Sequence, residues 1–483
     1  MAHNRGLAHA ALDELLDIGN LPRSAGERVT ITGDDPVLPT RYRIGTAGAG
    51  VLAATGVAAS ELWRIKTGRT QTVTVDVPAA AVSLRSGRYM SIAGKPADRD
   101  FAPLMRFYPT RDGRWLFLHT NFPNLRDQAL RLLGVPDDLA SVTAAIGQGD
   151  GEALETMLHE GGACAGFVRT HAEWDSHPHA QAISVLPAVE ITRIGDAPPR
   201  PLPFGDRPLS GVRVLDLTRV IAGPTCARTL AEHGADVLKI TRAGLADSGQ
   251  LDLDTGIGKL SAHLDLREAD QHARLRELAG TADVFSQSYR PGTLAARGFS
   301  PEALAELRPG MVYVTLSAWG HTGPWRNRRG YDTVVQAATG MADASGGDAG
   351  GAAGGAAGGA AGGASGPRHL PVSAIDYVGG NLMAYGAMVA LLRRATEGGS
   401  WLVRASLATT GRWIVQRGVL DDATWRTAPE DLPAARIARL TTEVDAPDGR
   451  IRYLAPIVRM SETPARWARP PVPLGYHPAA WPS

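Results

Sequence analysis

The feature that most constrains the fold is a regular alternation of strand and helix patterns, which begins at residue 212. Val212–Leu217 is a short apolar run typical of a buried strand, and Pro224 suits the first turn of a helix that continues to Glu232. Such alternation favours an α/β fold with an open, doubly wound, mainly parallel sheet that helices cover on both faces. The pattern continues with strands at Asp236–Ile240, Asp283–Ser286 and Met311–Ser317, and helices at Glu268–Ala279 and Pro301–Leu307.

Two segments of unusual composition interrupt the chain. Residues 197–208 are rich in proline, which disfavours helix and predicts an extended linker. Before it, Asp112-Gly113 predicts a hairpin between Arg106–Pro109 and Trp115–His119, with helices from 124 to 172, so we expect a smaller α+β domain at 97–196. Residues 345–366 are almost entirely Gly and Ala and predict a flexible loop.

An internal repeat relates two parts of the chain at an offset of 330 residues. Gly56 corresponds to Gly386 at this offset. Each copy is expected to form a buried helix of small apolar residues, a turn and a strand. At the same offset Asp376 falls opposite Thr46. The expected strands are Thr72–Val77 and Leu402–Leu407.

Composition excludes several classes of protein. The net charge is +1, from 50 Lys and Arg against 49 Asp and Glu, so we expect no broad binding of nucleic acid or of an anionic membrane. The two cysteines, Cys164 and Cys226, suggest neither a disulfide framework nor a zinc site, which fits a reducing cytoplasm. His177 and His179 flank Pro178 without acidic or cysteine neighbours, so a surface loop is favoured over a metal site.

Neither a signal peptide nor a membrane span is expected. Asp13, Glu14 and Asp17 interrupt the first apolar stretch. The nearly uncharged segments 44–59 and 375–392 fall at or below the roughly 18 to 20 apolar residues that a span needs, and their small residues favour close packing inside the protein.

Several motifs follow the linker in a fixed order. They are Pro208–Pro224, Leu230–Ile240, Tyr289–Gly292, Ser317–Pro324, Gly330–Asp332 and Ile375–Tyr377. Together they resemble family III CoA-transferases, the group that includes formyl-CoA transferase, the carnitine CoA-transferases and acyl-CoA racemases. The part before the linker is similar to the later portion of the same family, at Thr67–Gln71 and Phe107–His119, so the chain looks like a rearranged partial duplication.

The resemblance implies a division of the chain. Residues 209–425 would form a Rossmann-like, CoA-binding large domain, with the half-repeat of residues 1–96 packed on it and residues 426–483 as a C-terminal extension. Family members form interlinked dimers, so a homodimer is implied.

Asp376 is the central candidate for chemistry. By its pattern alone, an Asp before an apolar helix is a helix N-cap. The resemblance identifies it as the nucleophile of a CoA transfer, through an aspartyl-acyl anhydride and an aspartyl-CoA thioester. We expect the helix N-terminus to keep the carboxylate ionised. This chemistry needs neither a metal nor a tightly bound cofactor, since acyl-CoA and a carboxylic acid are its substrates, and Thr46 leaves one active site per chain.

The resemblance also implies which residues contact CoA at the carboxyl ends of the strands. Ile221 replaces the glutamine of formyl-CoA transferase, which argues against that substrate, and Ala296 stands where many members have the arginine that Arg297 would replace. Read alone, Arg242 is equally a solvated surface charge. The implied contacts are Val220, Ile221 and Ala222 at the thiol end, Arg242 and Arg297 at phosphates, and Ser288 and Tyr289 along the path.

Two other functions stay open. The rearranged halves are also compatible with a non-catalytic CoA-binding or assembly protein of the same fold. A racemase is disfavoured because the histidine base of its Gly-His-Asp motif is replaced in Gly330-Tyr331-Asp332, where Asp332 would anchor the loop.

Overall fold

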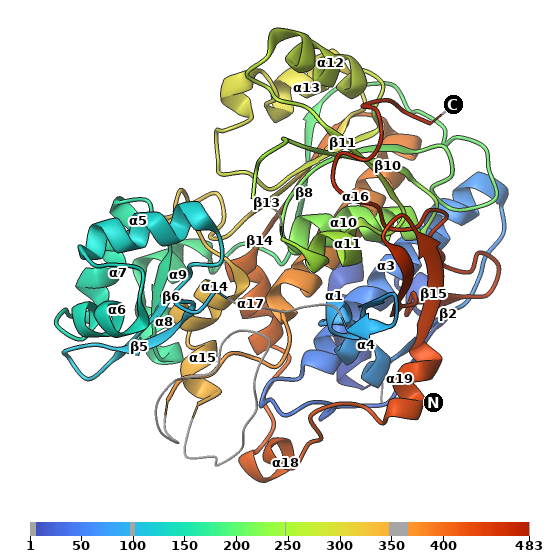
Figure 1. Ribbon diagram of the computed structural model, residues 1–483. Helices are drawn as coiled ribbons and strands as arrows, with labels where there is room; N and C mark the ends of the chain where they lie inside the picture. Colours follow the sequence, from blue (N-terminus) through green and yellow to red (C-terminus); the bar gives the residue numbers. More distant parts are fainter. Residues whose placement is uncertain (1–5, 97–101, 247, 347–365, 483) are drawn as a thin grey trace.

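The computed structural model describes residues 6–96, 102–246, 248–346 and 366–482 (Figure 1). Most of the Gly/Ala segment that we expect to be a flexible loop, residues 347–365, therefore lies outside the described residues. The described part is mixed α/β, with one seven-stranded sheet and three smaller sheets. This confirms the mixed α/β class that the sequence predicts, whereas the Rossmann-like detail and the domain boundaries stay predictions.

The large sheet carries the alternating part of the sequence. The first of its parallel strands, β9, lies inside the sheet, and the chain then adds parallel strands outward on both sides of it. Six strands run parallel, and β8 closes one edge in the antiparallel direction. In sheet order the strands are β11 (Lys259–His263), β10 (Asp236–Thr241), β9 (Arg213–Leu217), β12 (Val284–Gln287), β13 (Val312–Ser317), β14 (Ser400–Ser406) and β8 (Glu190–Gly195).

Helices cover both faces of this sheet. Alternate residues of each strand point to opposite faces, so Val214 packs in one apolar cluster with α10 (Ala222–Glu232) and α16 (Ala374–Glu397). Its neighbour Leu215 packs in a second cluster with α12 (Ala269–Ala279) and α13 (Pro301–Leu307), which lie at the top of Figure 1. Strands buried on both faces explain the nearly continuous apolar runs in the sequence.

Sequence patterns missed α11 (Gln250–Gly256), β11 and β8. Strand β11 contains Lys259, which is buried and paired with a carboxylate, so the strand carries no alternation that a pattern could reveal. Strand β8 leaves most of its residues partly exposed at the sheet edge and pairs with β14, some 200 residues later in the chain.

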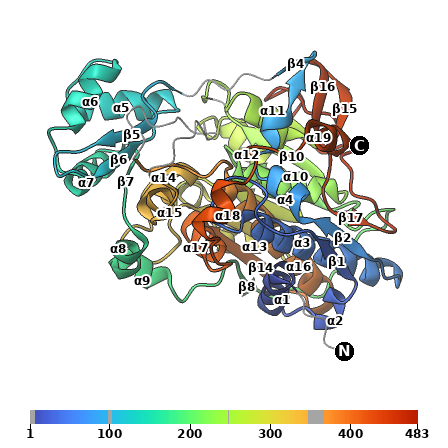
Figure 2. The same ribbon diagram turned by 90° about the horizontal axis from the view of Figure 1, so that it is seen from below.

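Residues 102–189 form a lobe at one side of the molecule (Figures 1 and 2). The predicted hairpin is confirmed: β5 (Arg106–Pro109) pairs with β6 (Trp115–Leu118). The span that we expect to be helical also contains a strand, β7 (Ala165–Phe167), because these buried residues complete a small sheet beside β6. The helices are α5 (Pro123–Leu133), α6 (Leu139–Ile146), α7 (Gly151–Glu160), α8 (His171–Ser176) and α9 (Pro178–Ile183).

The repeat is real in three dimensions. Helix α3 (Ile44–Thr67) and helix α16 (374–397) differ by 330 at both ends, and they pack against each other. A Cβ atom on Gly56 would lie 2.6 Å from Val73 Cγ1, and one on Gly386 would lie 2.6 Å from Val403 Cγ1. Both glycines therefore allow the same close approach of a helix to the strand that follows it.

The strands of the two repeat copies lie in different sheets, but each has one parallel and one antiparallel neighbour. Strand β2 (Val73–Asp76) has β1 (Val29–Thr32) parallel on one side and β17 (Arg459–Met460) antiparallel on the other. Strand β14 has β13 parallel and β8 antiparallel in the same way.

Among the described helices, α16 alone is long and apolar enough to cross a membrane by length and composition, but 94% of its most apolar window is buried inside the protein. Further helices are α1 (Leu7–Gly19), α2 (Arg23–Gly26), α4 (Val77–Ser83), α14 (Asp332–Ala338), α15 (Met341–Ala344), α17 (Leu407–Val415) and α18 (Asp422–Arg426). The C-terminal part contributes α19 (Ala434–Leu440), β15 (Thr441–Ala446) and β16 (Gly449–Leu454), which joins β3 (Ser91–Ile92) and β4 (Lys95–Pro96) in one sheet (Figure 2).

Candidate active site

A cavity of about 290 Å³ lies at the carboxyl ends of β9, β12 and β13. We call it the Asp376 cavity, because Asp376 reaches it from the first turn of α16. The structure thus brings together six of the eight site residues that we expect from the sequence: Asp376, Val220, Ile221, Ala222, Ser288 and Tyr289.

A strained turn places the first loop beside this cavity. Asp216, at the end of β9, accepts a hydrogen bond from the amide of Thr218 at 3.0 Å. Val220 then adopts a φ of 70°, in the left-handed region that β-branched residues avoid, and α10 begins two residues later.

A buried ion pair supports the same turn from below. Lys259 Nζ lies 2.7 Å from Asp216 Oδ2 and 2.8 Å from the carbonyl of Pro224 in α10. Both charged side chains are fully enclosed, and burial lowers the pKa of Lys259 to about 8 while Asp216 opposes the shift. The pair therefore ties β9, β11 and α10 together beneath the loop.

Asp376 does not cap its own helix, which corrects the reading from its pattern alone. Ser373 occupies the N-cap position, and the amide of Asp376 donates a hydrogen bond of 3.0 Å to Asp332 Oδ2. Asp332 begins α14 and also accepts from the side-chain amide of Gln336. Asp332 thus caps α16 from a separate helix, as Asp35 caps α3 through the amides of residues 45 and 46.

The electrostatic expectation for Asp376 is wrong. The side chain is 7% exposed, and burial, with Asp332 beside it, raises its pKa well above the ordinary value. Burial also raises the pKa of Asp332, but that carboxylate accepts amide hydrogen bonds that favour its charge. Burial and the neighbouring Asp332 therefore favour the protonated form of Asp376, and the helix N-terminus does not outweigh desolvation.

Arginines that sequence patterns did not reveal line the same cavity. Arg290 and Arg329 make no ion pair or side-chain hydrogen bond with any residue that the structure describes. Arg219 stacks over Phe122 at 5.5 Å, and the amino group Nη1 of Arg328 is buried without a hydrogen-bond partner in the described part of the chain. Among the lining residues that the structure describes, Asp376 alone is acidic, so the cavity is strongly cationic and suited to bind anions.

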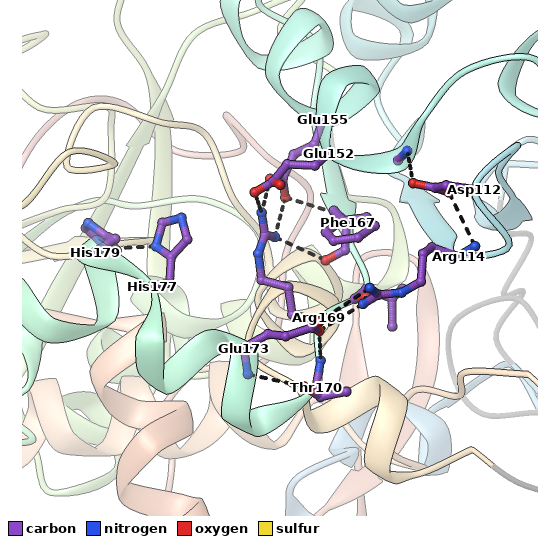
Figure 3. Close-up of polar contacts among 12 residues, drawn as sticks. Asp112, Arg114, Glu152, Glu155, Phe167, Arg169, Thr170, Glu173, His177 and His179 are labelled. Atoms are coloured by element: carbon purple, nitrogen blue, oxygen red, sulfur yellow. Dashed lines mark hydrogen bonds and ion pairs between the residues drawn. The ribbon is translucent and has the colours of Figure 1, made fainter.

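An ion-pair network of the side lobe contains Arg169, Glu152 and Glu155 (Figure 3). Arg169 forms a bidentate pair with Glu155, at 3.0 and 2.7 Å, and both are buried. Arg328 stacks on Trp325 at 4.3 Å and lies 3.8 Å from Glu155. Because Arg169 already satisfies Glu155, Arg328 keeps hydrogen-bonding capacity for a ligand.

The histidine pair is not a surface loop, which is a further correction. His179 lies in the first turn of the short helix α9 and is fully buried. Its ring contacts the carbonyl of Trp319 at 2.8 Å and accepts a hydrogen bond from the amide of Trp325 at 3.1 Å. His177 accepts from the amide of His179 (Figure 3). No cluster with metal-ligand composition occurs within the described ranges.

The side lobe supplies one wall of the cavity. Phe122 and Asn124 reach it from the segment after β6 and from the first turn of α5. Tyr331 stacks on His119 with ring centres 4.0 Å apart and lies 5.7 Å from Phe122. These contacts join residues about 200 positions apart, so no local signal could have indicated them.

The two remaining predicted residues lie elsewhere. Arg242 lines a neighbouring cavity of about 450 Å³ at the ends of β10 and β11, which we call the Arg242 cavity and which shares Arg219 with the first. Arg297 is exposed, donates to the carbonyl of Thr293 and lines neither cavity. Its phosphate contact stays a prediction.

A family model named CoA-transferase family III matches residues 22–198 and 209–437, on both sides of the linker. The chain belongs to CoA-transferase family III. One copy of the internal repeat lies in each matched segment, with α3 in the first and α16 in the second.

Relatives in the family are similar over part of their length. The chain is 30% identical over 349 residues to an acetyl-coenzyme A transferase of Hypoxylon pulicicidum, covering 67% of this chain and 56% of that protein. It is 34% identical over 152 residues to the succinyl-CoA:glutarate CoA-transferase of Homo sapiens, covering 29% and 35%.

A probable fatty acyl-CoA transferase of Mycobacterium tuberculosis is 30% identical over 214 residues, covering 42% of this chain and 50% of that protein. A crystal structure of the mycobacterial protein superposes with a TM-score of 0.38, at 30% identity, over 44% of this chain and 57% of that one. The chain thus spans about half the length of the relatives it matches.

Proposed function

We propose that this chain transfers CoA from an acyl-CoA thioester to a carboxylic acid, with Asp376 as the covalent nucleophile. The observation that carries the proposal is the Asp376 cavity, in which a buried carboxyl faces the first loop of a parallel sheet and several arginines in a chain of this family. Ligands of open parallel sheets bind at this edge, where the strand order reverses.

The steps balance without a metal or a redox partner. The Asp376 carboxylate attacks the thioester carbonyl, the C–S bond breaks, and the CoA thiolate leaves with the electron pair. The thiolate then attacks the aspartyl carbonyl of the anhydride, which releases the first acid as a carboxylate and leaves an aspartyl-CoA thioester. The incoming carboxylate attacks the carbonyl of the aspartyl-CoA thioester, the C–S bond breaks, and a new anhydride forms as the thiolate leaves. The thiolate then attacks the acyl carbonyl of this anhydride, which gives the new acyl-CoA and releases the Asp376 carboxylate.

The cavities support a route for CoA across the sheet. Counted from β9 as 1 to β14 as 6, the sheet order is 3-2-1-4-5-6, which supports our proposal of a Rossmann-like CoA-binding domain. In our proposal the nucleotide phosphates lie in the Arg242 cavity, the pantetheine arm passes Arg219, and the thiol reaches Val220–Ala222 beside Asp376.

The test is intact-mass and peptide mass spectrometry after incubation with a panel of acyl-CoA thioesters, with and without hydroxylamine. We expect a hydroxamate on the Asp376 peptide of the wild type and none in Asp376→Asn. The variant should fold at least as well, because removing a group with a raised pKa removes a penalty that grows as pH rises above the unfolded value of about 3.9.

Two alternatives give different outcomes. Binding of CoA without any adduct would indicate a non-catalytic CoA-binding or assembly protein. A racemase needs a base where Tyr331 stands; burial raises the pKa of that phenol, and burial lowers the pKa of neighbouring His119 to about 3, so neither is a suitable base at neutral pH. Exchange of the α-proton of an acyl-CoA with deuterium from solvent would support the racemase.

An interlinked homodimer in the cytoplasm completes the proposal. Light scattering of the purified chain tests the dimer, and fractionation of the producing cells tests the compartment.

A further inference from the structure

A third cavity, of about 370 Å³, lies on the other side of Asp376 from the Arg242 cavity. We call it the Arg404 cavity. Its floor is the face of the large sheet at the ends of β12, β13 and β14, and no role follows for it from the proposed path of CoA. It adjoins the Asp376 cavity, because the two share Tyr289, Arg290, Pro291, Leu316 and Ser317.

A row of polar residues crosses its floor. Strand register places Gln287 beside Thr315, Thr315 beside Arg404, and Arg404 beside Glu190. Gln287 donates a hydrogen bond of 2.6 Å to the hydroxyl of Thr315 and accepts one from the amide of Tyr289. The row is therefore built into the sheet and held by it.

Arg404 is the unusual member of this row. It is half-buried in a seven-stranded sheet, yet its guanidinium makes no ion pair or hydrogen bond with the residues that the structure describes. Glu190, directly opposite on β8, lies beyond ion-pair distance of it and pairs with His321 at 3.3 Å. An arginine in a partly desolvated position normally has an anionic partner, so its partner is expected to come from a ligand.

The charge and the lining of the Arg404 cavity also favour an anionic ligand. Arg290 and Arg326 also line it, and Glu190 is the single carboxylate among its described lining residues, so the cavity is cationic even with His321 neutral. Apolar side chains complete the lining between the arginines and are suited to contact methylene groups: Leu186, Leu294, Pro301, Tyr313 and Leu402.

We propose that the Arg404 cavity binds the second carboxylate of a dicarboxylic acid whose reacting carboxyl group lies at Asp376. This rests on the proposed function and names the class of acid for it. The order of the three cavities along the sheet edge separates the roles, since the nucleotide lies over β10 and β11 on one side and the acid over β13 and β14 on the other.

The test is a binding measurement that does not depend on turnover. Isothermal titration calorimetry on the free protein compares succinate, glutarate and adipate with butanoate, pentanoate and hexanoate, which have a methyl group in place of the second carboxylate. We expect at least one diacid to bind about tenfold or more tightly than its matched monoacid, the range of a charge-assisted hydrogen bond.

Arg404→Gln should abolish this preference, and Arg404→Lys should retain part of it. Arg193→Gln is the matched control, because Arg193 lies on the neighbouring strand β8, pairs with Asp196 and lines none of the three cavities. Equal binding of each diacid and its monoacid by the wild type, or an unchanged preference in Arg404→Gln with its CoA affinity intact, overturns the proposal.

The two proposals fail in different ways. If no adduct forms at Asp376 but the diacid still binds preferentially, the covalent transfer is rejected and the Arg404 cavity is kept as a diacid site. An adduct at Asp376 with no diacid preference in binding or in turnover would keep the transferase and reject the Arg404 cavity as its acid site.

Discussion

The crossing of α16 over α10 offers a direct test of how packing controls the candidate site. A Cβ atom on Gly380 of α16 would overlap the carbonyl oxygen of Ala222, a residue of the first loop and of the Asp376 cavity, and would lie 2.7 Å from Thr225 Cβ. Ordinary contact begins at 3.4 Å, so α10 must move by at least 0.7 Å in Gly380→Ala (3.4 − 2.7).

Gly379 provides a matched control on the same helix. Its added Cβ would lie 3.3 Å from Thr410 Oγ1, a side-chain atom that needs to move only slightly. Both substitutions gain about 1 kcal/mol of helix propensity, and overpacking at Gly380 costs about 1–3 kcal/mol, so Gly380→Ala should be less stable than Gly379→Ala by about 1–3 kcal/mol.

The assay combines urea unfolding with initial rates. Because displacement of a site by about 1 Å can reduce a rate by about 100-fold, we expect kcat/KM for acyl-CoA to fall about 10- to 100-fold in Gly380→Ala and to stay near the wild-type value in Gly379→Ala. Equal stability and equal kcat/KM in the two variants would refute the reasoning that α16 sets the position of the first loop.

Three further substitutions test the site. Asp332→Asn removes the charge that helps to raise the pKa of Asp376. Because kcat/KM should rise with pH as the nucleophile ionises, this rise should move to lower pH in the variant. An unchanged pH profile would contradict the coupling of the two carboxyl groups. Val220→Gly relieves a left-handed β-branched residue and should raise the free energy of unfolding by up to about 1 kcal/mol while weakening acyl-CoA binding; urea unfolding that shows a loss of stability would argue against strain at this turn. Lys259→Met leaves Asp216 buried without its partner and should lower the free energy of unfolding by about 3–5 kcal/mol, with partial recovery in Lys259→Met/Asp216→Asn. A double variant no more stable than the single one would show that the pair contributes little.

Local patterns were sufficient where the chain uses regular elements. The apolar run before residue 217, Pro224 in the first turn of α10 and Gly113 with its φ of 73° all led to elements that the structure contains. The repeat likewise predicted α3 and α16 and their following strands, because the small residues Gly56 and Gly386 are needed for the same close approach. The family motifs placed Asp376 and the first loop at one site, and both line the Asp376 cavity in the structure.

The sequence by itself therefore determined most of the regular strands and helices of the large sheet, the family to which the chain belongs and the candidate nucleophile. Tertiary structure alone decided the environment of that nucleophile: Asp332 comes 44 residues before Asp376, caps its helix and, with burial, raises its pKa. It also decided that Arg328 and Phe122 join the Asp376 cavity and that Arg404 lies in a cationic cavity beside it. Desolvation and charge proximity depend on distances between segments remote in sequence, and these distances are fixed only when the sheet and its covering helices pack.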